Sequence, residues 1–230
     1  MAVFNPPIYI KPVHPKGDVI VFGKPPELEL ADAANGIARF GGAWRSPSYF
    51  QAYLRAADVL VSHGAATDTL DDIGLPTFYM QRHALELLIK RFLSWVYEYA
   101  EAIGNKAVPT NNQRKRFKNS HCISKLLEDL RNTCRYYGFS EPPEELGALV
   151  KEVESFEASE TWARYESSES KNHGVLHHLK DEAVVPLVAL QKKLEAVASN
   201  SAFRFDGTEA YENELYYAWS DATDTTERDG

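Results

Sequence analysis

The chain has 230 residues, of which 44% are hydrophobic and 12% aromatic, and this composition excludes a wholly disordered chain, a fibre and a small disulfide scaffold. No apolar run approaches the roughly 20 residues that a membrane-spanning helix needs, and we expect no membrane partner. The N-terminus lacks the apolar stretch of a secretory signal, and the two cysteines, Cys122 and Cys134, give no disulfide framework. We therefore expect a soluble protein of a reducing, cytoplasmic compartment.

The net charge of -8 is unevenly distributed along the sequence. Residues 206–230 contain eight acids and one base. The segment between Ala102 and Leu127 contains no acid and six bases, which are Lys106, Arg114, Lys115, Arg116, Lys118 and Lys125. A basic segment of this kind attracts phosphate or nucleic acid, and the acidic tail could screen it. The alternative is a solvated loop for the bases and a frayed end for the acids.

The N-terminal residues differ in character from the rest of the chain. Segments 8–13 and 18–23 are rich in β-branched and aromatic residues and are separated by a Pro-Lys-Gly turn, which predicts a β-hairpin. The alternating segment 202–207 could add a third strand to it. We expect three parts: a β-rich N-terminal extension (1–45), a helical bundle (46–200) and an acidic C-terminal tail (201–230).

Apolar residues at helical spacing predict about five helices in the central part. The first follows Ser46 and Pro47 and ends at Gly64, and the strongest starts near Pro76 and runs to about Ala102. Three more are expected after the Asn-Ser pair at 119–120, after the Pro-Pro pair at 142–143, and over roughly 181–198. Segments 105–119 and 167–180 are expected to be long polar connections. The fold class is therefore mainly α, a helical bundle with a small β-rich N-terminal segment.

Three of these segments resemble a known superfamily. Segment 76–90, PTFYMQRHALELLIK, resembles a helix of bacterial HEPN-like proteins that begins with apolar residues and continues through a His or Arg, a Glu and a Leu-Lys step. Segment 120–127, SHCISKLL, is similar to the start of their next long helix, and segment 153–165 to their acidic-aromatic segment ending in Arg-Tyr. The resemblance covers about residues 75–198. It implies an antiparallel helical bundle, often dimeric, of the kind found in toxin, phage-defence and RNA-processing proteins.

The resemblance also implies a catalytic motif. Active members are metal-independent RNases that use Arg-x(4–6)-His, assembled across a dimer interface. Arg116 and His121 fit this spacing, as do Arg114 and His121. An imidazole can move the 2′-hydroxyl proton, and a guanidinium can hold the phosphate. The catalytic candidates are Arg116 and His121, and the nucleic-acid-binding candidates are Arg114, Lys115, Arg116 and Lys118. The alternative is that His121 packs near a helix cap and Arg116 belongs to a basic loop.

Glu86 and Lys90 are spaced i, i+4, which predicts an ion pair on a helix surface. The resemblance suggests a second interpretation, in which Glu86 lies on the inner side of the bundle and bonds Arg164 or His83, since a buried polar group needs a partner. Glu86 and Arg164 are thus candidate structural polar residues. The histidines of segment 173–178 lie in a loop-like stretch without a carboxylate at a familiar offset, and we expect no metal and no cofactor.

Three functions remain open from the sequence. The first is a non-catalytic or degenerate HEPN-like binding or assembly module of a bacterial or phage conflict system, which touches RNA through the basic segment 106–125. The second is an active HEPN-type RNase that uses Arg116 and His121 and is restrained by its own tail. The third is a helical protein–protein adaptor. The expected partners are RNA and either another protein or a second copy of the chain. The aromatic residues of the tail, Tyr211, Tyr216 and Trp219, could dock on the body or on a partner, or could belong to a loose end.

Overall fold

The computed structural model describes residues 26–38, 48–157, 167–170, 174–177, 182–204 and 209–228. The chain divides into two compact units, Met1–Ser48 and Tyr49–Gly230. The predicted strands at 8–13 and 18–23 lie outside the described residues. Within the first unit the described part contains helix α2 (Pro26–Ala34), so this part of the extension that was expected to be β-rich is helical.

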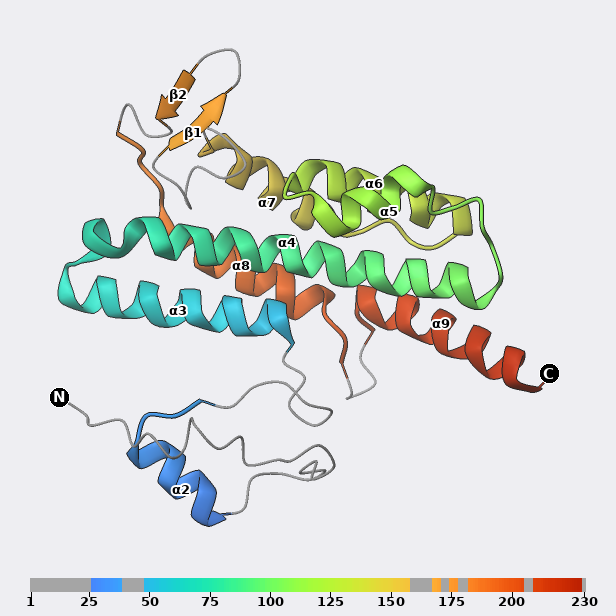
Figure 1. Cartoon of the computed structure of the whole chain (residues 1–230), viewed down its shortest axis with the longest axis horizontal. Helices are drawn as coiled ribbons and strands as arrows, with labels where there is room; N and C mark the ends of the chain where they lie inside the picture. Colours follow the sequence, from blue (N-terminus) through green and yellow to red (C-terminus); the bar gives the residue numbers. More distant parts are fainter. Residues whose placement is uncertain are drawn as a thin grey trace. The chain divides into compact units, whose positions relative to one another are not determined.

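The second unit is built around one long helix. Helix α3 (Tyr49–Thr67) runs antiparallel to α4 (Leu70–Ala102), and α6 (Ile123–Tyr137), α8 (Leu187–Ser201) and α9 (Tyr211–Arg228) also pack against α4 (Figure 1). Helix α7 (Glu144–Ser155) lies against α6 and α8, and α5 (Asn111–Asn119) lies against α6. The expectation of a mainly helical bundle is confirmed.

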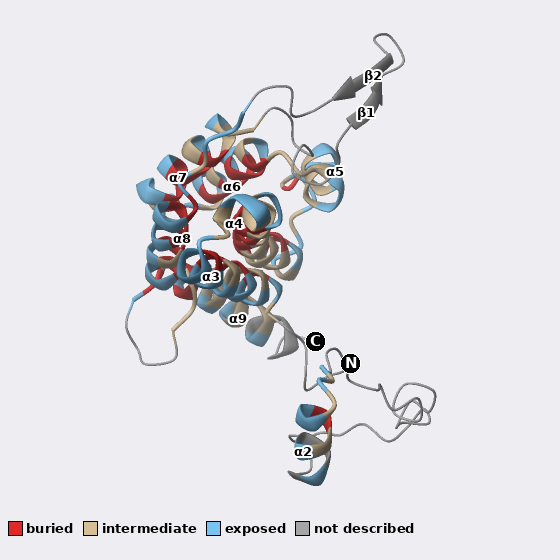
Figure 2. Cartoon of the chain, turned by 90° about the vertical axis from the view of Figure 1, so that its left-hand side faces the viewer, coloured by how far each residue is buried: buried red, intermediate tan, exposed pale blue. Residues whose placement is uncertain are grey.

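The central position of α4 follows from its sequence. Its 33 residues carry apolar side chains around much of the circumference, and a helix of that pattern is buried on several sides. In the end-on view of Figure 2, α4 lies in the middle of the unit, and the buried residues of its neighbours turn toward it. The fully buried residues of α4 include Phe78, Leu85, Leu88, Ile89, Phe92, Leu93 and Val96.

The predicted start of α4 at Pro76 is wrong by six residues. The helix begins at Leu70, and Pro76 lies inside it. Two acids, Asp71 and Asp72, occupy the first turn, where they interact favourably with the helix dipole. Pro76 has no N–H, so one backbone hydrogen bond is lost in the second turn of the helix. Burial of the apolar residues that follow Pro76 outweighs this local cost.

Segment 105–119 is not the continuous polar connection that was expected, because its second half forms α5. Thr110 and Gln113 make a capping box: the Gln113 N–H donates to Thr110 Oγ1 at 3.3 Å, and the Thr110 N–H donates to Gln113 Oε1 at 2.8 Å. The Asn-Ser pair at 119–120, which was expected to cap the next helix, ends α5 instead, and α6 begins at Ile123. Helix α6 then ends at Gly138, whose φ of 75° suits glycine.

Two further boundaries differ from expectation. Helix α8 begins at Leu187, directly after Pro186, and not near 181. Within the expected connection 167–180, β1 (Ser167–Ser170) pairs antiparallel with β2 (Gly174–His177), with Ser167 opposite His177. Arg164 and the residues 205–207 of the expected third strand lie outside the described residues. None of the described helices combines the length and the hydropathy that a bilayer span requires.

The C-terminal segment docks on the body as helix α9. Leu215 is fully buried, and the Tyr211 ring lies 5.1 Å from the Phe92 ring in edge-on geometry. Glu212 is also fully buried, and it accepts hydrogen bonds from Trp95 Nε1 at 2.7 Å and from the Arg91 guanidinium. Of the alternatives left open by the sequence, the described part of the tail is thus an anchor on the body.

Candidate nucleic-acid interface

Helix α5 has two chemically distinct faces. The outward residues are all exposed, and none of them makes a hydrogen bond or ion pair through its side chain within the described residues: Asn111, Asn112, Lys115, Lys118 and Asn119. All five side chains carry N–H donors, and none is acidic. This face is therefore suited to hydrogen-bond acceptors with negative charge, such as phosphate oxygens.

The inward face of α5 is fixed to the body by specific contacts. Arg116 donates from Nε and Nη2 to the two carboxylate oxygens of buried Asp129, at 2.7 and 2.5 Å. This bidentate pair raises the pKa of the Arg116 guanidinium, chiefly through the hydrogen bonds to Asp129. Gln113 Nε2 donates to Thr133 Oγ1 at 3.3 Å, and the Phe117 ring packs 5.4 Å from the Tyr97 ring. The orientation of the outward lysines is thus determined by the fold.

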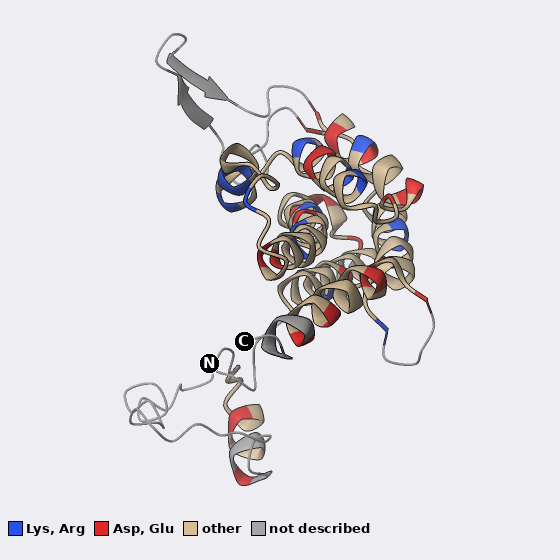
Figure 3. Cartoon of the chain, turned by 90° about the vertical axis from the view of Figure 1, so that its right-hand side faces the viewer, with Lys and Arg blue, Asp and Glu red and all other residues tan. Residues whose placement is uncertain are grey.

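The basic surface extends beyond α5 on both sides. Lys106 precedes the helix and Lys125 follows it, and both are exposed without an ion pair in the described part of the chain. Arg114 instead pairs with Glu101, with Nη1 2.6 Å from Oε1. In Figure 3, α5 carries Lys and Arg and no Asp or Glu, whereas residues of both charges occur on the neighbouring helices. We call Lys106, Lys115, Lys118 and Lys125 the lysine surface.

A buried polar cluster on α4 lies beside this surface. Glu86 is 1% exposed, and its carboxylate accepts from Lys90 Nζ at 2.9 Å and from Arg82 Nη1 at 3.2 Å. The Nδ1 atom of His121 lies 3.1 Å from Glu86 Oε1. We call Arg82, Glu86, Lys90 and His121 the Glu86 cluster. Its members come from one face of α4 and from the turn between α5 and α6.

The charges of the cluster keep Glu86 ionised. Burial acts to raise the pKa of this carboxyl group, but His83, Lys90 and His121 outweigh burial and lower the pKa from 4.5 to about 2. His83 itself lies with Nδ1 3.8 Å from Glu86 Oε2 and stacks on the Tyr79 ring. The expected surface ion pair between Glu86 and Lys90 therefore exists, but its acid is buried.

Arg82 connects three parts of the fold through one buried guanidinium. It bonds Glu86 on its own helix, the carboxylate of Glu157 just after α7, and the backbone oxygen of His121, which accepts from Nη2 at 2.6 Å. Arg82 therefore holds the turn between α5 and α6 against α4, and this contact positions the C-terminal end of α5.

The predicted catalytic residues have different partners. The Arg116 side chain is held by Asp129, whereas the His121 side chain, 40% exposed, is held by Glu86. No hydrogen bond or ion pair joins Arg116 to His121 among the described residues. The predicted bond between Glu86 and Arg164 falls outside the described part, and His83 is near Glu86 at ion-pair distance. The structure therefore groups Glu86 with His121 and places Lys115 and Lys118 on the open face of α5.

Sequence reasoning missed Asp129, which anchors the basic helix. A signal was present, because Asp129 stands among Leu126, Leu127 and Leu130 on a helix with an apolar face. An acid in such surroundings requires a partner, and the basic segment before it is a nearby source of cations in the sequence.

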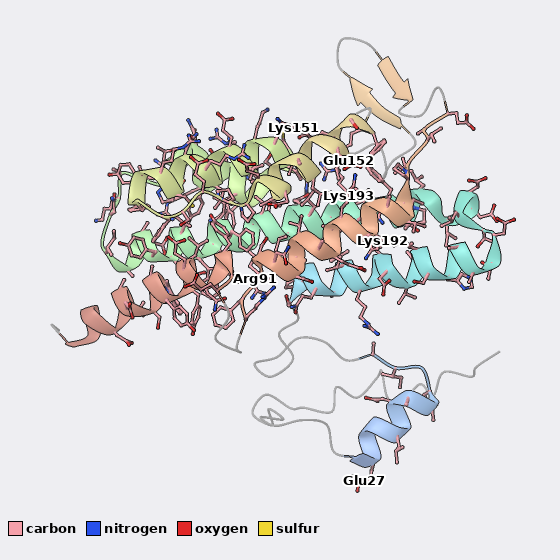
Figure 4. All side chains as sticks on the ribbon, turned by 180° about the vertical axis from the view of Figure 1, so that it is seen from behind. Glu27, Arg91, Lys151, Glu152, Lys192 and Lys193 are labelled. Atoms are coloured by element: carbon pink, nitrogen blue, oxygen red, sulfur yellow. The ribbon has the colours of Figure 1, made fainter. Side chains whose placement is uncertain are left out.

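An apolar groove of about 890 Å³ lies at the other end of α4. It is lined largely by aliphatic residues of the first turns of α4 and of the segment 182–192, which include the exposed Leu75, Val184 and Val188. Lys193 of α8 pairs with Glu152 of α7 at 2.7 Å on this side of the bundle (Figure 4). The groove offers mainly apolar contact, and the charged residues of its lining are Asp71, Glu182 and Lys192.

Among the described residues, no group of three or more His, Cys, Asp or Glu side chains could hold a metal ion. Comparisons of the chain with protein-family models, with curated proteins and with solved structures give no match.

Proposed function

We propose that the chain is a HEPN-like binding module of a bacterial or phage conflict system and that it holds RNA on the outward face of α5. The observation that supports this proposal is the composition of that face, which presents two lysines and three asparagines and no acid. Phosphate contacts from lysines provide the sequence-independent part of nucleic-acid affinity, and asparagine amides add hydrogen bonds.

The anchoring of α5 supports the same function. Because Arg116 is bonded to Asp129 and the turn at His121 is bonded to Arg82, the helix that carries Lys115 and Lys118 is held in place before a ligand arrives. Ordering in advance reduces the entropy lost on binding. The two arginines of the helix, Arg114 and Arg116, take part in ion pairs, so the exposed lysines are the phosphate-binding groups in this proposal.

The proposal is tested by fluorescence anisotropy with a labelled 12-nucleotide single-stranded RNA and the full chain. We expect Lys115→Ala combined with Lys118→Ala to weaken binding about tenfold at fixed salt. The matched control is Lys151→Ala combined with Lys192→Ala, which removes two exposed lysines of α7 and α8, labelled in Figure 4. No RNA binding by the unmodified chain, or an equal loss in both double variants, would contradict the proposal.

A second candidate function, a metal-independent RNase, is favoured by the pairing of His121 with Glu86. When the carboxylate accepts the Nδ1 hydrogen, the imidazole presents an unprotonated Nε2, which is the tautomer that a general base requires. In this function His121 takes the 2′-hydroxyl proton, and Arg116 divides its guanidinium between Asp129 and a phosphate.

The RNase function is tested by RNA cleavage in EDTA. It requires cleavage that disappears in His121→Ala while RNA affinity is kept. Absence of cleavage by the unmodified chain, with RNA binding retained, would leave the binding module as the function.

A further inference from the structure

A stripe on α6 continues past the end of α5. Asp129 and Thr133 lie one turn apart, and each receives a hydrogen bond from α5. Tyr136 follows Thr133 at the next turn of the same stripe. The side chain of Tyr136 thus stands just beyond the N-terminal end of α5, where the segment that carries Lys106 arrives.

Tyr136 is exposed but not loose. Its exposed fraction is 56%, whereas the tyrosine side chains of folded proteins are usually buried to a larger extent. Its ring lies 4.9 Å from the Tyr137 ring at an angle of 86°, and its hydroxyl accepts from Asn105 Nδ2 at 3.4 Å. Tyr137 is fixed in turn by its hydroxyl, which donates to the Val108 carbonyl, and by the Tyr99 ring 5.3 Å away. Because Tyr137 and Asn105 hold the Tyr136 ring in place, its exposed face is available for stacking on a planar group of a ligand.

The charges around Tyr136 favour an anionic ligand that carries a planar group. Asn105, which bonds the Tyr136 hydroxyl, is the neighbour of exposed Lys106 in the chain. Two acids of this region are paired with arginines, since Glu101 binds Arg114 and Glu141 binds Arg135. A ligand that stacks on Tyr136 therefore reaches the segment that carries Lys106, the member of the lysine surface next to Asn105.

We infer that Tyr136 is a stacking platform for an unpaired base, so that the ligand class is single-stranded RNA. This inference rests on the proposed function. In a duplex the faces of the bases are covered by their neighbours, whereas an unpaired base can stack on an aromatic ring while its phosphates follow basic groups. The lysines alone do not distinguish single strands from duplexes, because both carry phosphates. Tyr136 supplies that distinction.

The inference is tested with three probes on the full chain: a single-stranded RNA, its duplex, and inorganic polyphosphate, which has charge but no bases. We expect Tyr136→Ala to weaken single-strand binding about tenfold and to leave polyphosphate binding unchanged. Tyr136→Phe keeps the ring and should retain the affinity. The matched control is Tyr217→Ala, which removes another exposed tyrosine, 51% exposed, from α9.

The outcomes separate this inference from the proposal on which it rests. Single-strand binding that depends on Lys115 and Lys118 but is unchanged in Tyr136→Ala would overturn the stacking platform and leave the RNA-binding function standing. Equal affinity for the duplex and the single strand would do the same. Absence of RNA binding by the unmodified chain would overturn both.

Discussion

The imidazole of His121 lies with Nδ1 3.1 Å from the carboxylate of Glu86, although the two residues are 35 positions apart in the chain. This contact joins the turn after the basic helix to the central helix of the bundle. Arg82 reinforces the same junction by donating to the backbone oxygen of His121. The Glu86 cluster therefore stabilises the fold and also determines where the lysine surface stands.

Replacement of Glu86 should be strongly destabilising. Glu86→Ala leaves Arg82 buried with one carboxylate fewer, and the expected loss in the free energy of unfolding is about 3–5 kcal/mol, measured by urea denaturation. The control is Glu141→Ala, which breaks the exposed pair with Arg135 and should leave stability essentially unchanged. Equal effects in the two variants would show that the cluster does not support the fold.

Acid should weaken the fold through Glu86. Its pKa is about 2 in the folded protein and 4.5 ordinarily, so its ionised form stabilises the fold above pH 4.5, and this contribution is lost as the pH falls toward 2. The difference in unfolding free energy between the unmodified chain and Glu86→Gln should shrink by about 2 kcal/mol between pH 5 and pH 3. A constant difference over this range would contradict the low pKa.

Two tyrosine hydroxyls should respond differently to removal. The Tyr97 hydroxyl is buried and has no hydrogen-bond partner within the described residues, whereas the Tyr137 hydroxyl donates to Val108. Tyr97→Phe should thus be neutral or stabilising, and Tyr137→Phe should cost about 1 kcal/mol, as measured by thermal unfolding. Destabilisation by Tyr97→Phe alone would indicate a partner for that hydroxyl.

Helix α9 should behave as part of the core and not as a removable tail. Leu215→Ala should cost about 2–5 kcal/mol in unfolding free energy, because this side chain is fully buried against the bundle. Tyr217→Ala on the same helix is the control, since Tyr217 is half exposed. A Leu215 variant as stable as the Tyr217 variant would mean that α9 does not contribute to the core.

The helical periodicity of the sequence predicts most of the bundle, because the buried positions of α4, such as Leu85, Leu88 and Phe92, recur at helical spacing. It places the start of α4 too late, since Pro76 is a helix-start signal on local grounds and only the packing of the earlier turns overrides it. The capping box at Thr110 and Gln113 could have revealed α5, which was hidden by the polar composition of that segment.

The candidate site was predicted less completely than the fold. The basic residues of α5 are visible as a charge pattern, but the ion pair of Arg116 with Asp129 and the contact of His121 with Glu86 each join residues from two different elements of the fold. Helical spacing within one segment does not say which faces of two helices meet. The division of α5 into anchoring arginines and exposed lysines therefore required the tertiary structure.

The central claim, that the lysine surface binds RNA phosphates, is tested most directly by the salt dependence of RNA affinity. With four lysines in contact, the logarithm of the association constant should fall with the logarithm of salt concentration with a slope of about -3, from about 0.7 per contact on a single strand. Lys115→Ala combined with Lys118→Ala should reduce this slope to about -1.5, and Lys151→Ala combined with Lys192→Ala should leave it at the original value. A slope that is the same in both double variants would contradict the account.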